Sequence, residues 1–284
     1  MDIESKKFLG QPKNFVSIFN ALLFDGQPVL KPEYLKDENS ELVMNVSSKH
    51  VDIIKRYEDG TYLDLFVIES QSYGDPSMAV RVMEYESVAR MRYIRQCFKK
   101  HVPMHTRLPM ILTVVLFVGE SKWNAAKRLS EQEIIHPGFE DMFNEFKLNL
   151  IELNTNHKYN TGEKATQDFF DLLRMIYRKQ VLKEDLDREF NRDALYFAYV
   201  VTKNKELLSI YNKSEKGDVK VCRALDEMFE ESTNKGIQMG IKQGIELNQF
   251  EVYQTMLDKG FSVKAIASIF SVSEESIKEF LIYV

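Results

Sequence analysis

The stretch that decides the fold is residues 51–71, VDIIKRYEDGTYLDLFVIESQ. Two runs rich in Val, Ile, Leu and Tyr flank Asp59-Gly60, a dipeptide that is typical of a tight turn between antiparallel strands. The second run ends with Glu69 and Gln71, two polar side chains in an otherwise apolar setting. We therefore predict a β-hairpin whose second strand has a polar end.

The length of the turn decides which side chains of the hairpin share a face. A two-residue turn pairs Glu58 with Thr61 and, counted back along the strands, places Asp52 opposite Val67. Side chains alternate between the two faces of a strand, so Asp52 then shares its face with Glu69 as well. Diagonal neighbours on adjacent strands lie about 7 to 8 Å apart, which lets the two carboxylates converge on one cation. A three-residue loop or a bulge would undo this arrangement.

Two carboxylates on one sheet face suit a hard divalent cation. Mg²⁺ is typically held by one or two carboxylates, with waters and substrate phosphate oxygens as its other ligands. Such an ion polarises a phosphate and activates a water molecule, and Gln71, on the same face, would lie beside that water. The alternative is that Asp52 and Glu69 are solvated groups on an exposed face, as acidic residues on neighbouring strands often are.

The segments around the hairpin predict an α/β fold. Apolar residues recur at helical spacing over 14–24, and three strand-like runs follow at 41–46, 50–57 and 61–70. Asp75-Pro76 is then typical of a helix N-cap followed by proline at the first helical position.

The helix after Asp75-Pro76 should span roughly five to six turns and face the sheet with an apolar stripe. The stripe consists of Val80, Met83, Val88, Met91, Ile94 and Phe98. Residues 108–120 form a continuous apolar, β-branched run that is typical of a strand buried on both faces, and residues 148–153 are the last predicted strand. This order of helix, three strands, helix and strand indicates a mixed sheet flanked by helices.

Beyond about residue 165 the apolar spacing is helical throughout, which predicts an all-helical C-terminal extension. Within it, Gly236, Gly240 and Gly244 recur every four residues on one helical face. A glycine costs a helix about 1 kcal/mol relative to alanine. Three glycines in register therefore indicate the close approach of another helix, in the same chain or in a second copy. A mobile linker is the alternative.

Residues 261–281 predict two short helices, capped by Ser262 and Ser273. The pair resembles a DNA-binding helix-turn-helix only superficially, because three glutamates and a single lysine lie on the second helix, which would repel phosphates. We expect this pair to pack against another helix or subunit.

The composition favours a globular protein of the cytoplasm. The chain has 284 residues, is 44% hydrophobic and carries a net charge of −5, so any contact with a polyanion has to be local. Cys97 and Cys222 show no metal-ligand spacing, and a disulfide scaffold is not expected. The amino terminus lacks an apolar signal core and no run approaches the ~20 apolar residues of a membrane span. A soluble, cytoplasmic protein without membrane contact is therefore expected.

Four stretches carry a resemblance to a known family. They are NFVSIFNALLFDGQPVLKPEYL (14–35), VDIIKRY (51–57), VIESQSYGDPSMAVRVMEYE (67–86) and PMILTVVLFVGESKWNAAKRL (109–129). In this order they resemble the recombination-promoting nuclease family, the transposase-like branch of the PD-(D/E)XK nuclease superfamily. The resemblance covers about residues 8–155. Its most specific elements are Glu-x-Gln-Ser at Glu69, Met-x-x-Arg-x-x-x-Tyr at Met78, and Gly-x-x-x-Trp at Gly119.

The resemblance implies a restriction-endonuclease-like core that cuts DNA with Mg²⁺ or Mn²⁺. Asp52 and Glu69 match the two acidic positions of the family motif and would be the metal ligands. Gln71 occupies the position of the superfamily's catalytic lysine; it offers hydrogen bonds but no charge. Apart from the resemblance, Arg81 and Tyr85 lie four residues apart just after the hairpin, where they could face the DNA phosphate; pairing of Arg81 with Glu84 is the alternative.

Two functions stay open on the sequence alone. One is a metal-dependent DNA endonuclease linked to recombination or transposition, which the two acidic residues favour. The other is a DNA-binding or assembly protein that retains the nuclease scaffold without activity, which the missing lysine favours. The expected domains are a nuclease-like core at 1–160, a helical extension at 161–245 and a helical hairpin at 246–284, with a homo-oligomer formed through the C-terminal helices.

Overall fold

A computed structural model describes residues 3–37, 52–60, 63–101, 108–155, 157–214 and 217–283. Contacts within the chain group Met1–Leu225 and Asp226–Val284 into two compact units. The expected domain boundaries at 160 and 245 stay a prediction, while the contacts place the first helices of the C-terminal half in the same unit as the sheet. Among the described helices, none combines the length and the apolar character that a membrane span requires.

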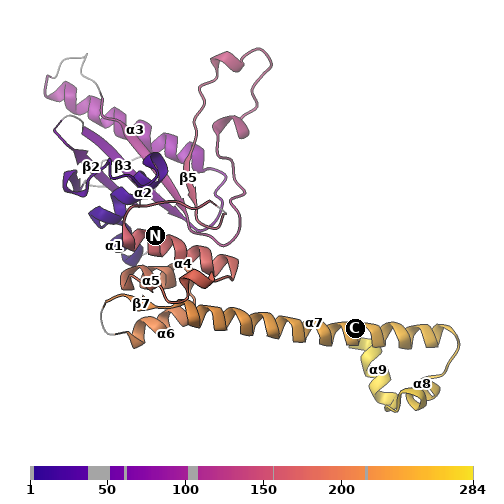
Figure 1. The fold of residues 1–284 in the computed structure, drawn as a ribbon. Helices are drawn as coiled ribbons and strands as arrows, with labels where there is room; N and C mark the ends of the chain where they lie inside the picture. The colour runs from indigo at the N-terminus through magenta and orange to yellow at the C-terminus, as the bar shows by residue number, and fades with distance from the viewer. Residues whose placement is uncertain are drawn as a thin grey trace. The chain divides into compact units, whose positions relative to one another are not determined.

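The centre of the first unit is a mixed sheet, which the described residues build from five strands in the order β1-β2-β3-β4-β5 (Figure 1). The strands are β1 Leu35–Asp37, β2 Ile53–Glu58, β3 Leu63–Gln71, β4 Ile111–Phe117 and β5 Asn149–Glu152. The first three pair antiparallel, and β3, β4 and β5 pair parallel. This confirms the predicted restriction-endonuclease-like sheet. The strand-like run 41–46 lies outside the described residues, and β1 was not expected.

Helices flank the sheet, and further helices follow it in the chain. They are α1 Ile3–Leu9, α2 Pro12–Phe24, α3 Met78–Lys99, α4 Lys164–Arg178, α5 Arg192–Thr202 and α6 Lys205–Lys213. Two-residue strands, β6 Glu189–Phe190 and β7 Val219–Lys220, pair with each other after α4. The predicted first helix at 14–24 and the helical character beyond residue 165 are both confirmed.

The alternation of side chains gives the two sheet faces different partners. On one face, Leu65 and Val67 of β3 pack with Tyr85 and Ala89 of α3. On the other face, the ring of Phe66 lies 4.8 Å from the ring of Phe19 on α2. Strand β4 lies between β3 and β5 and is buried along almost its whole length, as its continuous apolar run predicted. The α3 face carries the candidate site.

The stripe predicted for α3 is wrong, because other residues face the sheet. The buried residues of α3 are Met78, Ala79, Val82, Tyr85, Glu86 and Ala89. From the predicted stripe, Val80, Met91 and Phe98 are exposed. The helix approaches the sheet through two alanines, and Glu86 reaches into the sheet, where its Oε1 accepts the Thr113 N–H of β4 at 3.2 Å.

The second unit is helical. Helix α7, Cys222–Asp258, begins just before its boundary and is followed by α8 Val263–Phe270 and α9 Glu274–Tyr283. Ser262 accepts the Ala265 N–H at 3.2 Å and Ser273 accepts the Ser276 N–H at 3.0 Å, which confirms both predicted caps. A small core joins the three helices and consists of Tyr253, Ile266, Ala267 and Ile277. The terminal helix pair therefore packs on α7.

Candidate functional site

The register of the hairpin brings Asp52 and Glu69 together. Glu58 pairs with Leu63 rather than with Thr61, so the register predicted for the hairpin is wrong by two residues. Ile53 pairs with Ile68, and one step further along the strands Asp52 comes opposite Glu69. The two-residue shift in register leaves the alternation of side chains unchanged, which is why the two acidic residues still share a face.

Hydrogen bonds fix the two acidic residues against each other. The Ser70 N–H donates to Asp52 Oδ2 at 2.8 Å, and the Asp52 N–H donates to Glu69 Oε2 at 3.4 Å. The Asp52 side chain therefore crosses to β3, and the Glu69 side chain crosses toward β2. Both carboxylates lie at the same end of the hairpin.

Glu69 is buried and its carboxyl group holds a proton unusually well. The residue is 2% exposed. Burial raises the pKa of Glu69 most, and the neighbouring Asp52 carboxylate raises it further, while the Arg81 guanidinium and the Asp52 N–H lower it; the resulting pKa is about 7. A perturbed carboxyl group between a second carboxylate and a cation is a frequent feature of functional sites.

Gln71 lies on the same side of β3 as Glu69. Its Nε2 donates to Glu69 Oε1 at 3.2 Å, and the residue is buried. The carboxamide is therefore held against the carboxylate by a hydrogen bond rather than by charge. This places Asp52, Glu69 and Gln71 in one cluster, as the hairpin pattern predicted.

Arg81, from the first turn of α3, completes the cluster. Its guanidinium donates to Glu69 Oε1 at 2.9 Å and to Asp75 Oδ2 at 2.6 Å. It also donates to the Tyr85 hydroxyl at 3.0 and 2.9 Å. The structure thus gives Arg81 two acidic partners, neither of which is the alternative partner Glu84.

Asp75 is the site residue that the sequence pattern missed. It was predicted as the N-cap, but α3 begins at Met78 with Ser77 as the N-cap. Asp75 Oδ1 accepts the Ser77 N–H at 2.8 Å and the Ser77 hydroxyl at 2.7 Å. Although burial alone would raise it, these bonds and the Arg81 guanidinium hold the pKa of Asp75 below its ordinary value. The short turn before the helix thereby presents the second oxygen of Asp75 to Arg81.

The donor set suits a hard divalent cation. Two adjacent carboxylates offer oxygen ligands of the kind that Mg²⁺ and Mn²⁺ prefer, and a cation bound to Glu69 would oppose the burial and the Asp52 charge that raise its pKa. No group of three or more His, Cys, Asp or Glu side chains within the described part of the chain is arranged to hold a metal ion. Asp52 and Glu69 would therefore share the ion with waters and a substrate phosphate.

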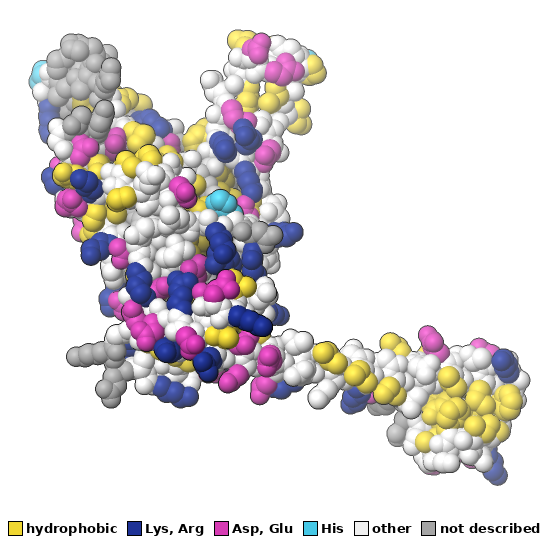
Figure 2. All heavy atoms as spheres, viewed as in Figure 1, with side chains coloured by type: hydrophobic (Ala, Val, Ile, Leu, Met, Phe, Trp, Pro, Cys, Tyr) yellow, Lys and Arg dark blue, Asp and Glu magenta, His cyan; other side chains and the backbone are white. Residues whose placement is uncertain are grey.

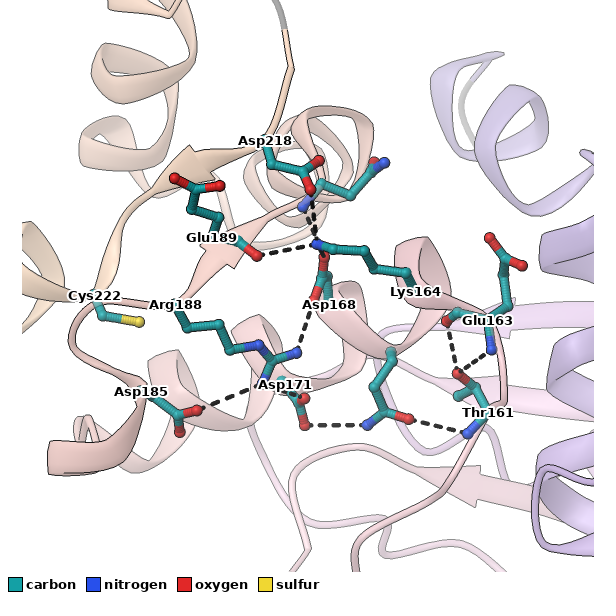
Figure 3. A network of polar contacts seen from close by, with 12 residues as sticks. Thr161, Glu163, Lys164, Asp168, Asp171, Asp185, Arg188, Glu189, Asp218 and Cys222 are labelled. Atoms are coloured by element: carbon teal, nitrogen blue, oxygen red, sulfur yellow. Dashed lines mark hydrogen bonds and ion pairs between the residues drawn. The ribbon is translucent and has the colours of Figure 1, made fainter.

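A second polar cluster lies on α4, and its charged groups are paired with one another (Figure 3). The buried Asp168 carboxylate accepts from Lys164 Nζ, from Arg188 and from the Asn191 N–H, each at 2.7 Å. Arg188 also reaches Asp171 at 2.9 Å. Because cations and a backbone N–H saturate Asp168, this network ties α4 to the β6 segment rather than offering a site to a ligand.

The comparison with family models decides the classification. The model Transposase_31, described as "Putative transposase, YhgA-like", matches residues 33–207, which is more than half of the chain and includes Asp52, Glu69, Gln71 and Arg81. The chain belongs to this family. Membership in the YhgA-like family agrees with the resemblance to transposase-like nucleases and supports a transposase- or nuclease-type function. No curated protein and no solved structure matches the chain.

Proposed function

We propose that the protein is a metal-dependent DNA endonuclease that hydrolyses phosphodiester bonds. The observation that carries the proposal is the meeting of the Asp52 and Glu69 carboxylates across the hairpin, with the Ser70 N–H on Asp52 and Gln71 on Glu69. Membership in the YhgA-like transposase family supports the same class of chemistry. The metal ion, its identity and the DNA substrate are part of the proposal.

Each residue of the cluster has a separate role in this proposal. Asp52 and Glu69 would hold Mg²⁺ or Mn²⁺, which polarises the phosphate and activates water when bound. Gln71, held beside Glu69, would orient the attacking water by hydrogen bonds. Arg81 brings the positive charge that Gln71 lacks, and Tyr85 fixes its guanidinium. Arg81 would stabilise the additional negative charge on the phosphate in the transition state.

Nicking of supercoiled plasmid by the purified chain tests the proposal. We expect cleavage with Mg²⁺ or Mn²⁺, its loss with EDTA, and its loss in Asp52→Ala and Glu69→Ala, since either change removes half of the protein's carboxylate ligands. Circular dichroism checks that both variants fold. Absence of cleavage by the wild type with every divalent ion tried, or undiminished cleavage by folded Asp52→Ala, would contradict the proposal.

Gln71 variants separate metal binding from orientation of water. Gln71→Ala should slow cleavage by about 10² to 10⁴, the usual effect of losing one positioned catalytic group, with little change in metal affinity. Gln71→Lys should retain or raise activity because it restores the superfamily residue. A Gln71→Ala variant with wild-type rates would show that the carboxamide only packs against Glu69.

The second candidate function is a DNA-binding or assembly protein without catalysis. The observation that favours it is the ion pair of 2.9 Å between Arg81 and Glu69, which gives Glu69 a cationic partner within the protein, together with the neutral Gln71. DNA binding that persists in EDTA, without cleavage under any metal, would favour this function.

A further inference from the structure

A pocket of about 560 Å³ opens beside Asp52 and is lined by lysines from two elements. Lys6 and Lys7 reach it from α1, and Lys55 reaches it from β2. Gln11, the N-cap of α2, lines it as well and makes no side-chain capping bond, so the positive end of that helix faces the same space. The family match begins at residue 33, so α1 and its two lysines lie outside it.

The charge of this pocket contrasts with that of the whole chain. The sequence carries a net charge of −5, yet the pocket gathers three lysines, with Asp37 and Asp52 as the acidic side chains among its lining residues. Asp52 belongs to the proposed metal site. Once a divalent cation balances Asp52, the remaining charge of the lining is positive.

Lys55 is the most informative of the three lysines. Its side chain is 7% exposed, and its ammonium lies 2.6 Å from Asp37 Oδ1, whereas the side chain of Asp37 is 92% exposed. The ring of Phe15 lies 5.9 Å from Nζ. An ammonium has three N–H donors, and desolvating it is costly unless anions surround it. Among the described residues Asp37 is the one carboxylate paired with this ammonium, and a single solvent-exposed carboxylate leaves donors of Lys55 for a second anion.

We propose that this pocket binds a backbone phosphate of the DNA strand next to the phosphodiester that is cut. The inference rests on the proposed nuclease function and assigns it a strand-holding subsite made of Lys6, Lys7 and Lys55. Asp52 lines this pocket and also belongs to the metal site, so the two adjoin at Asp52, with Lys55 on the α2 face of the sheet and Glu69 on the α3 face. Because these lysines would contact backbone phosphate and not base edges, they would hold the strand without recognising its sequence.

The alternative is a purely structural role, in which Lys55 only forms a cross-strand ion pair. Lys55 and Asp37 are register partners on β2 and β1, and such a pair needs no ligand. Lys36, the preceding residue of β1, forms a diagonal cross-strand ion pair with Glu58 of β2, is more exposed than Lys55 and does not line the pocket. Lys36→Gln is therefore a matched control for Lys55→Gln.

Binding of the full chain to a labelled DNA duplex in EDTA tests the inference, because no cleavage is then expected. We expect Lys55→Gln to make the slope of log affinity against log salt less negative by about 0.9, and the double variant Lys6→Gln/Lys7→Gln by about 2, over about 50 to 200 mM salt. The loss should be the same for unrelated sequences. Lys36→Gln and the double variant Lys183→Gln/Lys205→Gln, at exposed positions outside the pocket, should keep the wild-type slope.

Lys6 and Lys7 are exposed on α1, so their variant tests the pocket without disturbing the buried Lys55. A wild-type slope in Lys6→Gln/Lys7→Gln, or equal losses in the control variants, would overturn the inference. The result is separable from the proposed catalysis. If the wild type cleaves DNA and the pocket variants bind DNA with the wild-type salt slope, the subsite is rejected and the nuclease function is retained. If the salt slopes of the pocket variants are less negative and the wild type does not cleave DNA, the pocket binds DNA phosphate and the nuclease function is rejected.

Discussion

At the scale of single residues, the burial of Glu69 links the chemistry of the site to stability. Its pKa is raised from 4.5 to about 7, so the folded protein binds this proton more tightly than the unfolded chain does. The resulting contribution to the free energy of unfolding is fully present below pH 4.5 and is lost as the pH rises through about 7. The shift corresponds to about 3 kcal/mol.

Glu69→Gln should therefore be more stable than the wild type at pH 8, by up to about 3 kcal/mol, and close to it at pH 4.5. Guanidinium unfolding in EDTA at several pH values, followed by the fluorescence of Trp123, measures the difference. Trp123 is the only tryptophan in the sequence, and it is buried against Phe117 near the site. A difference between the two proteins that stays constant with pH would contradict the assigned pKa.

The same residues show how far the sequence predicts the site. The shared face of Asp52 and Glu69 follows from the alternation of side chains, which tolerates a register error of two residues. The partners of Arg81 did not follow, because Glu69 lies twelve residues away and meets Arg81 only through the way α3 packs on the sheet. Asp75 carries a local capping signal, and that signal does not reveal that its second oxygen binds Arg81.

At the scale of elements, α3 shows why apolar periodicity misidentified the buried face. The prediction counted large apolar side chains, whereas the residues of α3 that are buried include Ala79 and Ala89 together with Tyr85 and Glu86. Small residues permit close packing, and Glu86 is satisfied by the Thr113 N–H and by Arg90. Neither property enters a count of hydrophobic residues. The strands were more predictable, because a β-branched apolar run such as β4 has few alternatives.

The α4 network gives a second test at this scale. Asp168→Asn removes the charge that Lys164 and Arg188 share, and it should destabilise the first unit by about 3 kcal/mol, the usual effect of breaking a buried ion pair. Asp185→Asn is the matched control, since Asp185 lies 3.5 Å from Arg188 in a less buried position; its loss should stay within about 1 kcal/mol. Guanidinium unfolding followed by Trp123 fluorescence measures both. Equal losses would show that burial of Asp168 does not set the strength of the network.

At the scale of the whole molecule, the chain places its candidate chemistry in the first unit, and the second unit carries exposed apolar side chains at a regular spacing. Figure 2 shows hydrophobic side chains along α7. On this helix Ile237, Ile241 and Ile245 are each more than half exposed. Apart from their chain neighbours and the backbone of α7 itself, Gly236, Gly240 and Gly244 have no described atom within 4 Å of where a Cβ would lie. The sequence predicted that the Gly-Ile repeat lies on one helical face. It could not predict which helix packs on that face, because within the described chain nothing packs against it.

This combination leads us to expect that α7 pairs with α7 of a second copy. Each of the three glycines lowers the stability of the helix by about 1 kcal/mol relative to alanine. Close packing of a second helix on the glycines and the adjacent isoleucines would offset this cost. Replacing all three glycines with leucine should block the approach and lower the sedimenting mass or the solubility. Replacing them with alanine keeps the face small and should preserve the wild-type mass. If the leucine variant matches the wild type in both sedimentation and melting, α7 does not pair through this face, and the glycines serve the chain as a linker.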